Sequence, residues 1–413
     1  MRTAFLGILV ASLGSTIMWL LLVPYFDQTA HSSGLVGMLG MERQIMMVAG
    51  SLLVGVWADR GRVIRKFALL EGAQLALAVV FLVLLGFSPD LDPAFVLVWT
   101  AVRFAVVGAS TVLAYRLLAD LSGSSSRGAV FHMVTSPQGA MVFASVVCVL
   151  IPVWTTRSIT VALTVDVVTA AAVLVFLLAR GPRLESSSGS LAFGWRAVGR
   201  HVVTALRGYW LPELRPWSWV QLCFLVSLSG MMVYGYAIAE RLPGVPAAIG
   251  FAASWFFYGL AFWVTAPLVR TGPGARQWGV VFAAALAAAG VLGAITGLDA
   301  VATHVAIYLA LTFVNAFWLH YTNARILERA PGAAIGQVRA SMLFYLGVVF
   351  GVGEQLVGFA VQSPTGNLLL GLARLAGGLA LLAAAILWGG GRGTRTSIAR
   401  LPDAPPVAAG HDR

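Results

Sequence analysis

Long apolar stretches separated by short polar ones make up most of the chain. A helix that crosses a bilayer needs about 20 mostly apolar residues. The stretches that meet this requirement are 4–26, 36–57, 66–88, 93–117, 130–153, 158–179, 217–239, 247–269, 278–297, 303–325, 338–361 and 368–389. The pattern therefore predicts twelve membrane-spanning helices. The first stretch is longer than the ~7–15 apolar residues of a signal-peptide core, so we expect it to be the first span.

One longer polar segment divides these stretches into two sets of six. It predicts an N-terminal six-helix bundle over 1–180, a cytoplasmic linker over 181–216 and a C-terminal six-helix bundle over 217–389. Apolar residues within 191–209 recur every three or four positions, which predicts an amphipathic helix on the inner membrane surface. A partner-binding helix is the alternative. The tail, 390–413, is rich in Gly, Pro and Arg and is predicted to be disordered.

Composition and charge point to the same class of protein. The 413 residues are 59% hydrophobic and only 10% charged, whereas soluble domains carry about 25% charged residues. The net charge of +11 would suggest nucleic acid as a partner of a soluble protein. Here only Arg157 and Arg241, of 27 basic residues, fall in loops on the side of the membrane opposite both termini. By the positive-inside rule, both termini are cytoplasmic, the bilayer is the partner, and no nucleic acid is expected.

The cysteines give no sign of a metal or redox site. Cys148 and Cys223 both fall within predicted spans, and neither has a CxxC partner or a nearby histidine. The sequence also has no Walker A pattern, which argues against direct use of ATP. We therefore predict an all-α integral protein of the cytoplasmic (inner) membrane, without cofactor or metal.

The loop after the second stretch carries a recognisable motif. The segment 55–66 reads GVWADRGRVIRK, and its cluster of Arg and Lys between two spans marks a cytoplasmic loop. It resembles the G-x-x-x-D-R-x-G-R-[KR] signature of the major facilitator superfamily. Gly55, Asp59 and Arg60 stand in register, Gly61 and Arg62 come one place early, and Arg65 and Lys66 close the run. The resemblance implies two six-helix pseudo-repeat halves around a central transport path.

Further motifs resemble the macrolide-efflux and enterobactin-exporter group of that superfamily. The most specific is PGAAIGQVRAS, 331–341, which is similar to their P-x-x-x-x-G-R-V-x-S with Gln337 in place of arginine. The other matching positions are Leu13-Gly14-Ser15, Thr29, Glu71, Val165-Asp166, Gly351 and Gly358. This resemblance implies export of small molecules.

A gating network is predicted at the inner helix ends. Asp59 ends the second stretch, and Arg116 and Asp120 end the fourth. Acids and arginines that converge at neighbouring helix ends can lock one arrangement of two halves. The resemblance implies that this network, with Gly55, Arg60, Arg62 and Arg65, holds the outward-facing state. The alternative is that the arginines only set topology.

Ionisable residues inside spans are costly and are functional candidates by default. They are Glu42, Arg43, Glu71, Arg103, Asp166, Glu354 and Arg374. Arg103 and Asp166 lie near the predicted midplane and either pair with one another or line a cavity separately. We expect Glu354 and Arg374, at matching depth on consecutive helices, to form a structural ion pair. For proton coupling, the first candidates are Asp166 and Glu354, with Glu42 and Glu71 in reserve, and Glu71 is a candidate support for the Asp59 network.

The resemblance implies that helices 1, 4, 7 and 10 line the substrate path. Their candidate residues are Trp19, Arg103, Tyr234, Asn315, Trp318 and His320. Such a mixture suits a large, partly apolar solute, although many of these aromatic rings could equally face lipid. His320 is either a proton relay or a structural residue.

The leading hypothesis is a monomeric secondary transporter that exports a small amphiphilic molecule, such as an antibiotic or siderophore, by alternating access in exchange for protons. A transporter working inward or a lipid translocator is the nearest alternative. A membrane enzyme or a non-transporting sensor on this fold is less favoured. The six histidines are scattered singly without a catalytic constellation, and the linker and tail are too short for the added soluble domain expected of a sensor.

Overall fold

The computed structural model describes residues 2–30, 32–58, 63–88, 91–122, 142–148, 158–180, 199, 202–203, 206–270, 273–329 and 335–389. Most of the predicted fifth span (130–153), most of the linker helix (191–209) and the tail (390–413) therefore lie outside the described residues. Within them, 142–148 and parts of 199–208 are helical.

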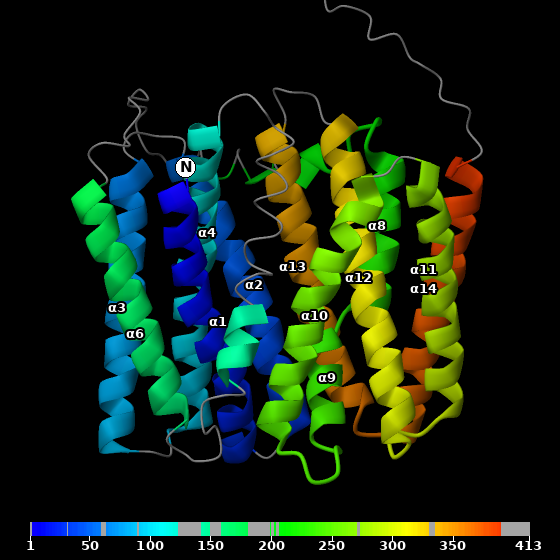
Figure 1. The fold of residues 1–413 in the computed structure, drawn as a ribbon, viewed down its shortest axis with the longest axis horizontal. Helices are drawn as coiled ribbons and strands as arrows, with labels where there is room; N and C mark the ends of the chain where they lie inside the picture. Colours follow the sequence, from blue (N-terminus) through cyan, green and yellow to red (C-terminus); the bar gives the residue numbers. More distant parts are fainter. Residues whose placement is uncertain are drawn as a thin grey trace, which may run out of the picture.

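Long helices form almost all of the described structure. The first group comprises α1 (Arg2–Ala30), α2 (Ser33–Ala58), α3 (Val63–Phe87), α4 (Pro93–Ser122) and α6 (Ser158–Arg180). The second comprises α8 (Arg215–Leu228), α9 (Met231–Ala239), α10 (Ala247–Arg270), α11 (Pro273–Ile295), α12 (Val301–Arg329), α13 (Ile335–Ala360) and α14 (Pro364–Gly389). The groups stand side by side, and α1 begins at the end of the bundle where α14 finishes (Figure 1).

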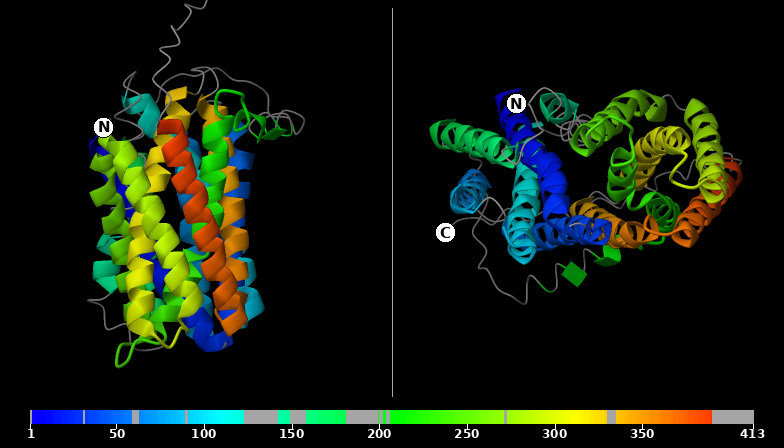
Figure 2. Two further views of the ribbon diagram at one scale, coloured as in Figure 1. Left: turned by 90° about the vertical axis from the view of Figure 1, so that its right-hand side faces the viewer. Right: turned by 90° about the horizontal axis from the view of Figure 1, so that it is seen from below.

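The two groups repeat one packing pattern. In the first, α1 packs on α6, α2 on α4, and α3 on both α4 and α6. In the second, α8 packs on α14, α10 on α12, and α11 on both α12 and α14. The correspondence is that of two related halves, which Figure 2 shows from the end opposite the N-terminus.

The main contact between the halves is made by α2 and α13. Small residues let the two backbones approach closely. A Cβ on Gly37 would lie 2.8 Å from the carbonyl oxygen of Glu354, and one on Gly347 would lie 2.0 Å from Val48 Cγ2. Gly351, noted in the sequence as a motif position, lies against Met41 in the same seam.

The predicted seventh span, 217–239, is not one continuous helix. It is split into α8 and α9 at Ser229 and Gly230. Gly230 has φ +75°, a left-handed conformation that L side chains rarely adopt. Hydropathy does not reveal such a break, because the residues on both sides of it are mostly apolar.

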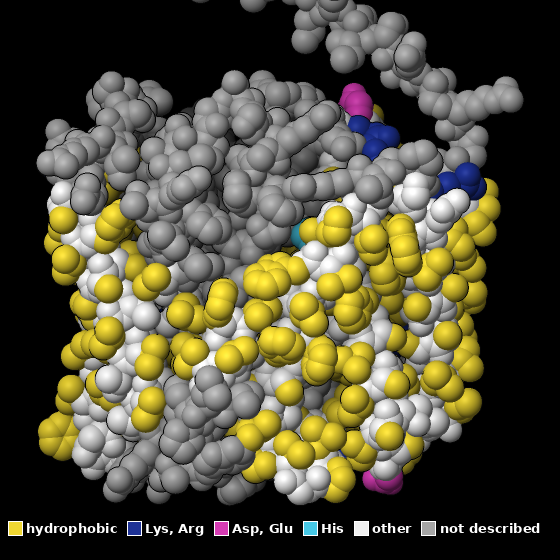
Figure 3. Space-filling view, viewed as in Figure 1, with side chains coloured by type: hydrophobic (Ala, Val, Ile, Leu, Met, Phe, Trp, Pro, Cys, Tyr) yellow, Lys and Arg dark blue, Asp and Glu magenta, His cyan; other side chains and the backbone are white. Residues whose placement is uncertain are grey.

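The outside of the helices is apolar. Among the described residues, nine helices are long and apolar enough to cross a membrane. Large hydrophobic side chains such as Leu69, Val175 and Leu387 are exposed, and hydrophobic atoms cover the sides of the described part in Figure 3. An apolar outer surface of this extent requires lipid around it. The chain is therefore a multi-pass membrane protein.

Candidate functional site

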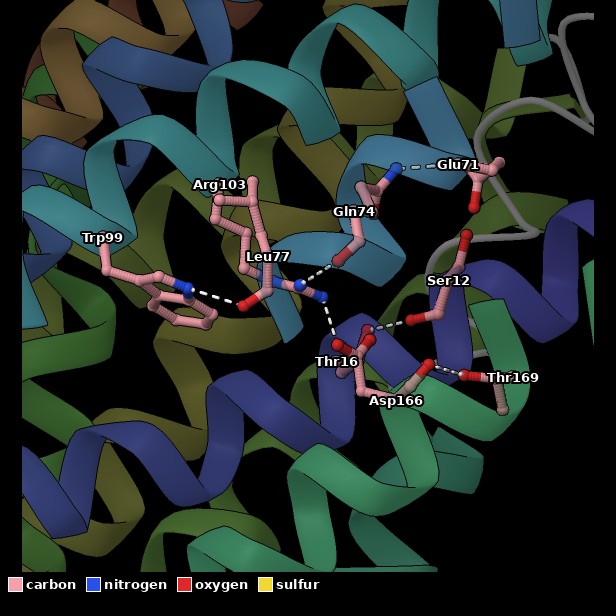
Figure 4. A network of polar contacts seen from close by, with 9 residues as sticks. All are labelled: Ser12, Thr16, Glu71, Gln74, Leu77, Trp99, Arg103, Asp166 and Thr169. Atoms are coloured by element: carbon pink, nitrogen blue, oxygen red, sulfur yellow. Dashed lines mark hydrogen bonds and ion pairs between the residues drawn. The ribbon is translucent and has the colours of Figure 1, made fainter. Parts of the chain in front are cut away.

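Arg103 and Asp166 meet inside the first half. Arg103 of α4 donates through Nη2 to Asp166 Oδ2 of α6, and both residues are almost completely buried. Arg103 Nη1 also donates to the carbonyl oxygen of Gln74 at 3.2 Å. The structure therefore selects the first of the two sequence-based alternatives, a buried ion pair (Figure 4).

The same network extends to Glu71. Its Oε1 accepts hydrogen bonds from Gln74 Nε2 at 3.0 Å and from Ser110 Oγ at 2.5 Å. Glu71 thus ties α3 to α4, and Gln74 links it to Arg103. Its described contacts place it in this buried network, while the suggested link to Asp59 lies outside the described residues.

Close packing of α1 against α6 explains the glycine of the Gly14-Ser15 motif. A Cβ on Gly14 would lie 1.9 Å from Thr169 Oγ1 and 3.2 Å from Asp166 Cα, so only glycine lets α1 approach α6. Ser15 interacts with the Asp166 carboxylate from α1. The two motifs that the sequence suggested in the first and sixth spans therefore meet at one place.

The expected ion pair between Glu354 and Arg374 is wrong. Both side chains are described, and each has other partners. Glu354 of α13 accepts hydrogen bonds from the backbone N–H groups of Met232, at 3.3 Å, and Val233, at 3.0 Å. These are among the unpaired N–H groups at the start of α9, which a carboxylate stabilises.

Arg374 lies instead against an aromatic ring. Its Cζ is 4.1 Å from the centroid of Tyr234, and the Tyr234 hydroxyl is 2.6 Å from His304 Nδ1. Tyr234, a candidate substrate-path residue, is thus fully buried in a polar cluster of α9, α12 and α14. Arg374 therefore makes a cation–π contact with Tyr234 in place of the predicted ion pair with Glu354.

Arg43 lies between the two halves. Its Cζ is 4.5 Å from the ring centroid of Trp19, 5.4 Å from that of Phe104 and 5.8 Å from that of Trp255. Trp19 and Phe104 belong to the first half, and Trp255 belongs to α10 in the second. We call Arg43 and these three rings the Arg43 box.

The Arg43 box does not open to lipid. On α2, the buried residues Val36 and Leu39 share the face of Arg43, and the exposed residues Met38 and Ile45 lie elsewhere. Arg43 is nevertheless only partly buried. Arg43 therefore lies on the face of α2 that packs inside the protein.

Glu42, a reserve coupling candidate, points another way. It shares a helix face with the exposed Met38 and Ile45, is partly buried, and has a backbone partner at Ala101 of α4. One of its carboxylate oxygens is buried without a hydrogen-bond partner. The structure separates Glu42 from the Arg43 box.

The remaining candidates lie on α12. Asn315 Nδ2 donates to the Tyr258 hydroxyl at 2.9 Å, while Asn315 Oδ1 is buried without a partner. Trp318 is buried, with its Nε1 also unpartnered. His320 Nε2 lies 3.2 Å from the carbonyl oxygen of Phe262, a contact that fits a structural role.

The sequence reasoning missed Trp255 and Tyr258. They stand three residues apart on α10, and so share a helix face. The predicted substrate path comprised the first, fourth, seventh and tenth of the twelve predicted spans, whereas α10 corresponds to the eighth, 247–269. A Trp-x-x-Tyr spacing within a span was the available signal.

The predicted gate is not tested. Asp59, Arg60 and Arg62 lie outside the described residues, and the surroundings of Gly55 and the side chains of Arg116 and Asp120 are likewise undescribed. Arg65 is exposed at the start of α3. The gating role stays a prediction.

A second contact joins the halves at the opposite end from the termini. Tyr236 of α9 donates to Asp27 Oδ2 of α1 at 3.0 Å. Glu240 follows α9, outside the membrane span, and interacts with Asp27 as well. Partial burial and the nearby Asp27 carboxylate raise the pKa of Glu240 from 4.5 to about 7, although Arg241 opposes the shift.

This pKa predicts a pH-dependent contact. Below pH ~7 Glu240 is protonated and can donate to Asp27, and above it two carboxylates repel. The folded state binds more protons than the unfolded state between pH 4.5 and about 7, so stability from this group should fall as pH rises through that window. We expect Glu240→Gln to flatten this part of the pH profile of thermal unfolding. The exposed Glu213→Gln serves as the control, and an unchanged slope in Glu240→Gln would contradict the assignment.

Comparisons with known proteins show the fold. No protein-family model matches the sequence, and no curated protein matches it. Solved structures do match. The human organic anion transporter MFSD10 superposes with a TM-score of 0.67 at 14% identity, over 93% of this chain and 98% of that one. A POT family transporter gives 0.66 at 14% identity, over 92% and 94%. The nucleoside transporter NupG gives 0.61 at 12% identity, over 92% and 98%. The chain has the fold of the major facilitator transporters.

Proposed function

We propose that the protein is a secondary transporter of the major facilitator superfamily that exports a small amphiphilic molecule in exchange for protons. The two halves, 1–180 and 217–389, would rock about the α2–α13 seam and expose a central site to each side in turn. The termini would face the cytoplasm, and the protein would act as a monomer in the inner membrane.

The observation that carries this proposal is the presence of charged side chains where the two halves meet. Arg43 of α2 lies against Trp19 of the first half and Trp255 of the second, and Glu354 of α13 packs against α2, where a Cβ on Gly40 would lie 3.2 Å from Glu354 Cβ. Burying charges inside a membrane protein is expensive, and an apolar contact would join two static halves at lower cost. Charges at a seam between two mobile bodies are instead what substrate binding and coupling require.

The contacts across the seam support one state of the cycle. Asp27 and Tyr236 join α1 to α9 at the end away from the termini, and Gln355 Nε2 donates to the Gly34 carbonyl oxygen there at 3.3 Å. With the termini inside, these contacts favour a conformation closed on the outer side. The pH dependence predicted for Glu240 would then act on the outer gate.

The direction of transport rests on the sequence motifs. Leu13-Gly14-Ser15 and PGAAIGQVRAS resemble exporters, whereas the proteins of like fold are named for organic anions, peptides and nucleosides. One fold therefore serves many solutes. An importer or a lipid translocator is the alternative, and an enzyme or sensor on this fold is less well supported.

An accumulation panel tests the proposal. A bacterial host depleted of its own pumps would express wild type or Asp59→Asn and be exposed to amphiphilic antibiotics, dyes and siderophores, with and without a protonophore. We expect wild type to lower the accumulation of some compounds, and we expect both the substitution and the protonophore to abolish that effect. Raised accumulation would indicate import. No effect on any compound, with the protein present in the membrane, would contradict export of amphiphiles.

A further inference from the structure

The Arg43 box holds hydrogen-bond donors that have no acceptor. Trp19 Nε1, Arg43 Nε and Trp255 Nε1 are all buried without a hydrogen-bond partner. Buried polar groups are almost always paired, and leaving one unpaired is destabilising. Three such donors, contributed by α1, α2 and α10 around one guanidinium, indicate a place where an acceptor-bearing molecule belongs.

The charge at this place is positive. Among the described residues, no acid forms a salt bridge with Arg43. Glu354 acts on it electrostatically, but the Glu354 oxygens already accept the N–H groups of Met232 and Val233. A guanidinium offers a planar fork of donors that matches a carboxylate or phosphate. An anionic group would therefore satisfy both the charge and the unpaired donors.

The walls of the box define the rest of the ligand. Trp19 and Phe104 pack edge to face, with ring centroids 5.2 Å apart, and Trp255 lies across the seam on the other half. Flat aromatic walls suit an aromatic or otherwise apolar body. Near the box, Asn315 Oδ1 is an unpaired acceptor, so it suits a hydroxyl or amide N–H of the ligand.

We propose that the Arg43 box binds the acid group of an amphiphilic organic anion, whose apolar body lies against Trp19, Phe104 and Trp255. This inference deepens the proposed function, on which it rests, by naming the class of substrate. Because the rings come from both halves, such a ligand would bridge the seam that must open during transport.

Matched probes of one size test the charge requirement. The full-length protein, purified in detergent at about pH 7, would be titrated with 1-naphthaleneacetic acid, its methyl ester and 2-(1-naphthyl)ethylamine. Binding would be followed by tryptophan fluorescence and thermal stabilisation. We expect the acid to bind at least about 10-fold more tightly than the ester, and the amine more weakly than either, since a charge-assisted bidentate contact favours the acid.

Variants then assign the effect to residues. Arg43→Gln should weaken binding of the acid roughly 10- to 100-fold and leave the ester unchanged. Arg43→Lys, which keeps the charge without the planar fork, should lie between Gln and wild type. Trp255→Phe keeps an aromatic ring but removes the indole N–H, and should weaken binding of the acid several-fold. Trp263→Phe, on the same helix but exposed, is its matched control.

Some outcomes would overturn the proposal. Equal binding of acid and ester, an acid-to-ester ratio unchanged in Arg43→Gln, or no binding of any probe at millimolar concentration would each do so. If Arg43→Gln does not fold, as judged by gel filtration, the acid-to-ester ratio is compared between Trp255→Phe and Trp263→Phe. An equal ratio in these two variants would overturn the proposal. The accumulation panel is independent. Export without a preference for the acid would contradict the anionic ligand class but agree with the proposed transporter function. A preference for the acid without any transport would contradict the transporter function but agree with an anion-binding site.

Discussion

Asp166→Ala should destabilise the protein by about 3–5 kcal/mol, because it leaves the Arg103 guanidinium buried and unpaired. Arg103 is fully buried in the first half, and apart from Asp166 its described hydrogen-bond partner is the Gln74 carbonyl oxygen. No water or lipid head group can reach it easily. The change in the free energy of unfolding would be measured by titrating SDS into mixed micelles.

Removing both charges should cost much less than removing one. We expect the double variant Arg103→Met/Asp166→Ala to recover most of the stability, since replacing a buried ion pair by apolar side chains is often close to neutral. Glu213→Gln, an exposed carboxylate, is the control and should lie within about 0.5 kcal/mol of wild type. A double variant no more stable than Asp166→Ala would contradict the pairing.

The double variant also separates structure from transport. Arg103→Ala alone is a poor test of function, because it would leave Asp166 buried and unpaired. A double variant that folds but does not export would place the pair in the transport cycle. A double variant that folds and exports would make the pair a structural element of the first half, and would leave proton coupling to Glu354.

The apolar runs predicted much of the fold, because a membrane helix must satisfy its own backbone and carry about 20 apolar residues. Depth along the helices also put Arg103 and Asp166 at one level. For Glu354 and Arg374, matching depth alone led to the wrong prediction of an ion pair. Their levels match, but each faces a different neighbour, and the break at Gly230 that creates the partner of Glu354 has no signature in hydropathy.

Helix faces were the least predictable feature. In a soluble protein the apolar face of an amphipathic helix identifies the side that packs in the core, whereas a helix in lipid is apolar on both its buried and its lipid-facing sides. On α2, Met38 and Ile45 are exposed and Leu39 is buried, yet all are hydrophobic. The sequence could therefore not show that Arg43, and not Glu42, faces the interior. From the sequence, Arg43 is predicted only as a charge within a span and not as a site residue.

The carboxylate of Glu354 occupies a position that can couple charge to movement. It is the acceptor for two N–H groups at the start of α9, immediately after the left-handed Gly230, and it belongs to α13, which forms the seam with α2. A proton on this carboxyl would convert an acceptor into a donor and weaken its hold on α9. A change of charge at one residue would then loosen a joint between two helices.

Glu354→Gln should therefore uncouple transport from the proton gradient. In proteoliposomes with a solute found by the accumulation panel, we expect this variant to keep exchange of labelled for unlabelled solute, but to lose at least about 10-fold of the uptake driven by a pH gradient. Glu354→Ala, which removes both acceptors, should lose exchange as well, because the α9 N–H groups are then unpaired.

Glu42→Gln provides the matched control. Glu42 is also a carboxylate within a span, but its backbone partner is Ala101 of α4, whereas the N–H groups at the start of α9 donate to Glu354. It should retain gradient-driven uptake. If Glu354→Gln accumulates solute like wild type, Glu354 is only a cap for α9, and the coupling acid must be sought at Asp166. If Glu42→Gln loses coupling as well, the position of a carboxyl at the joint is not what couples protons to transport.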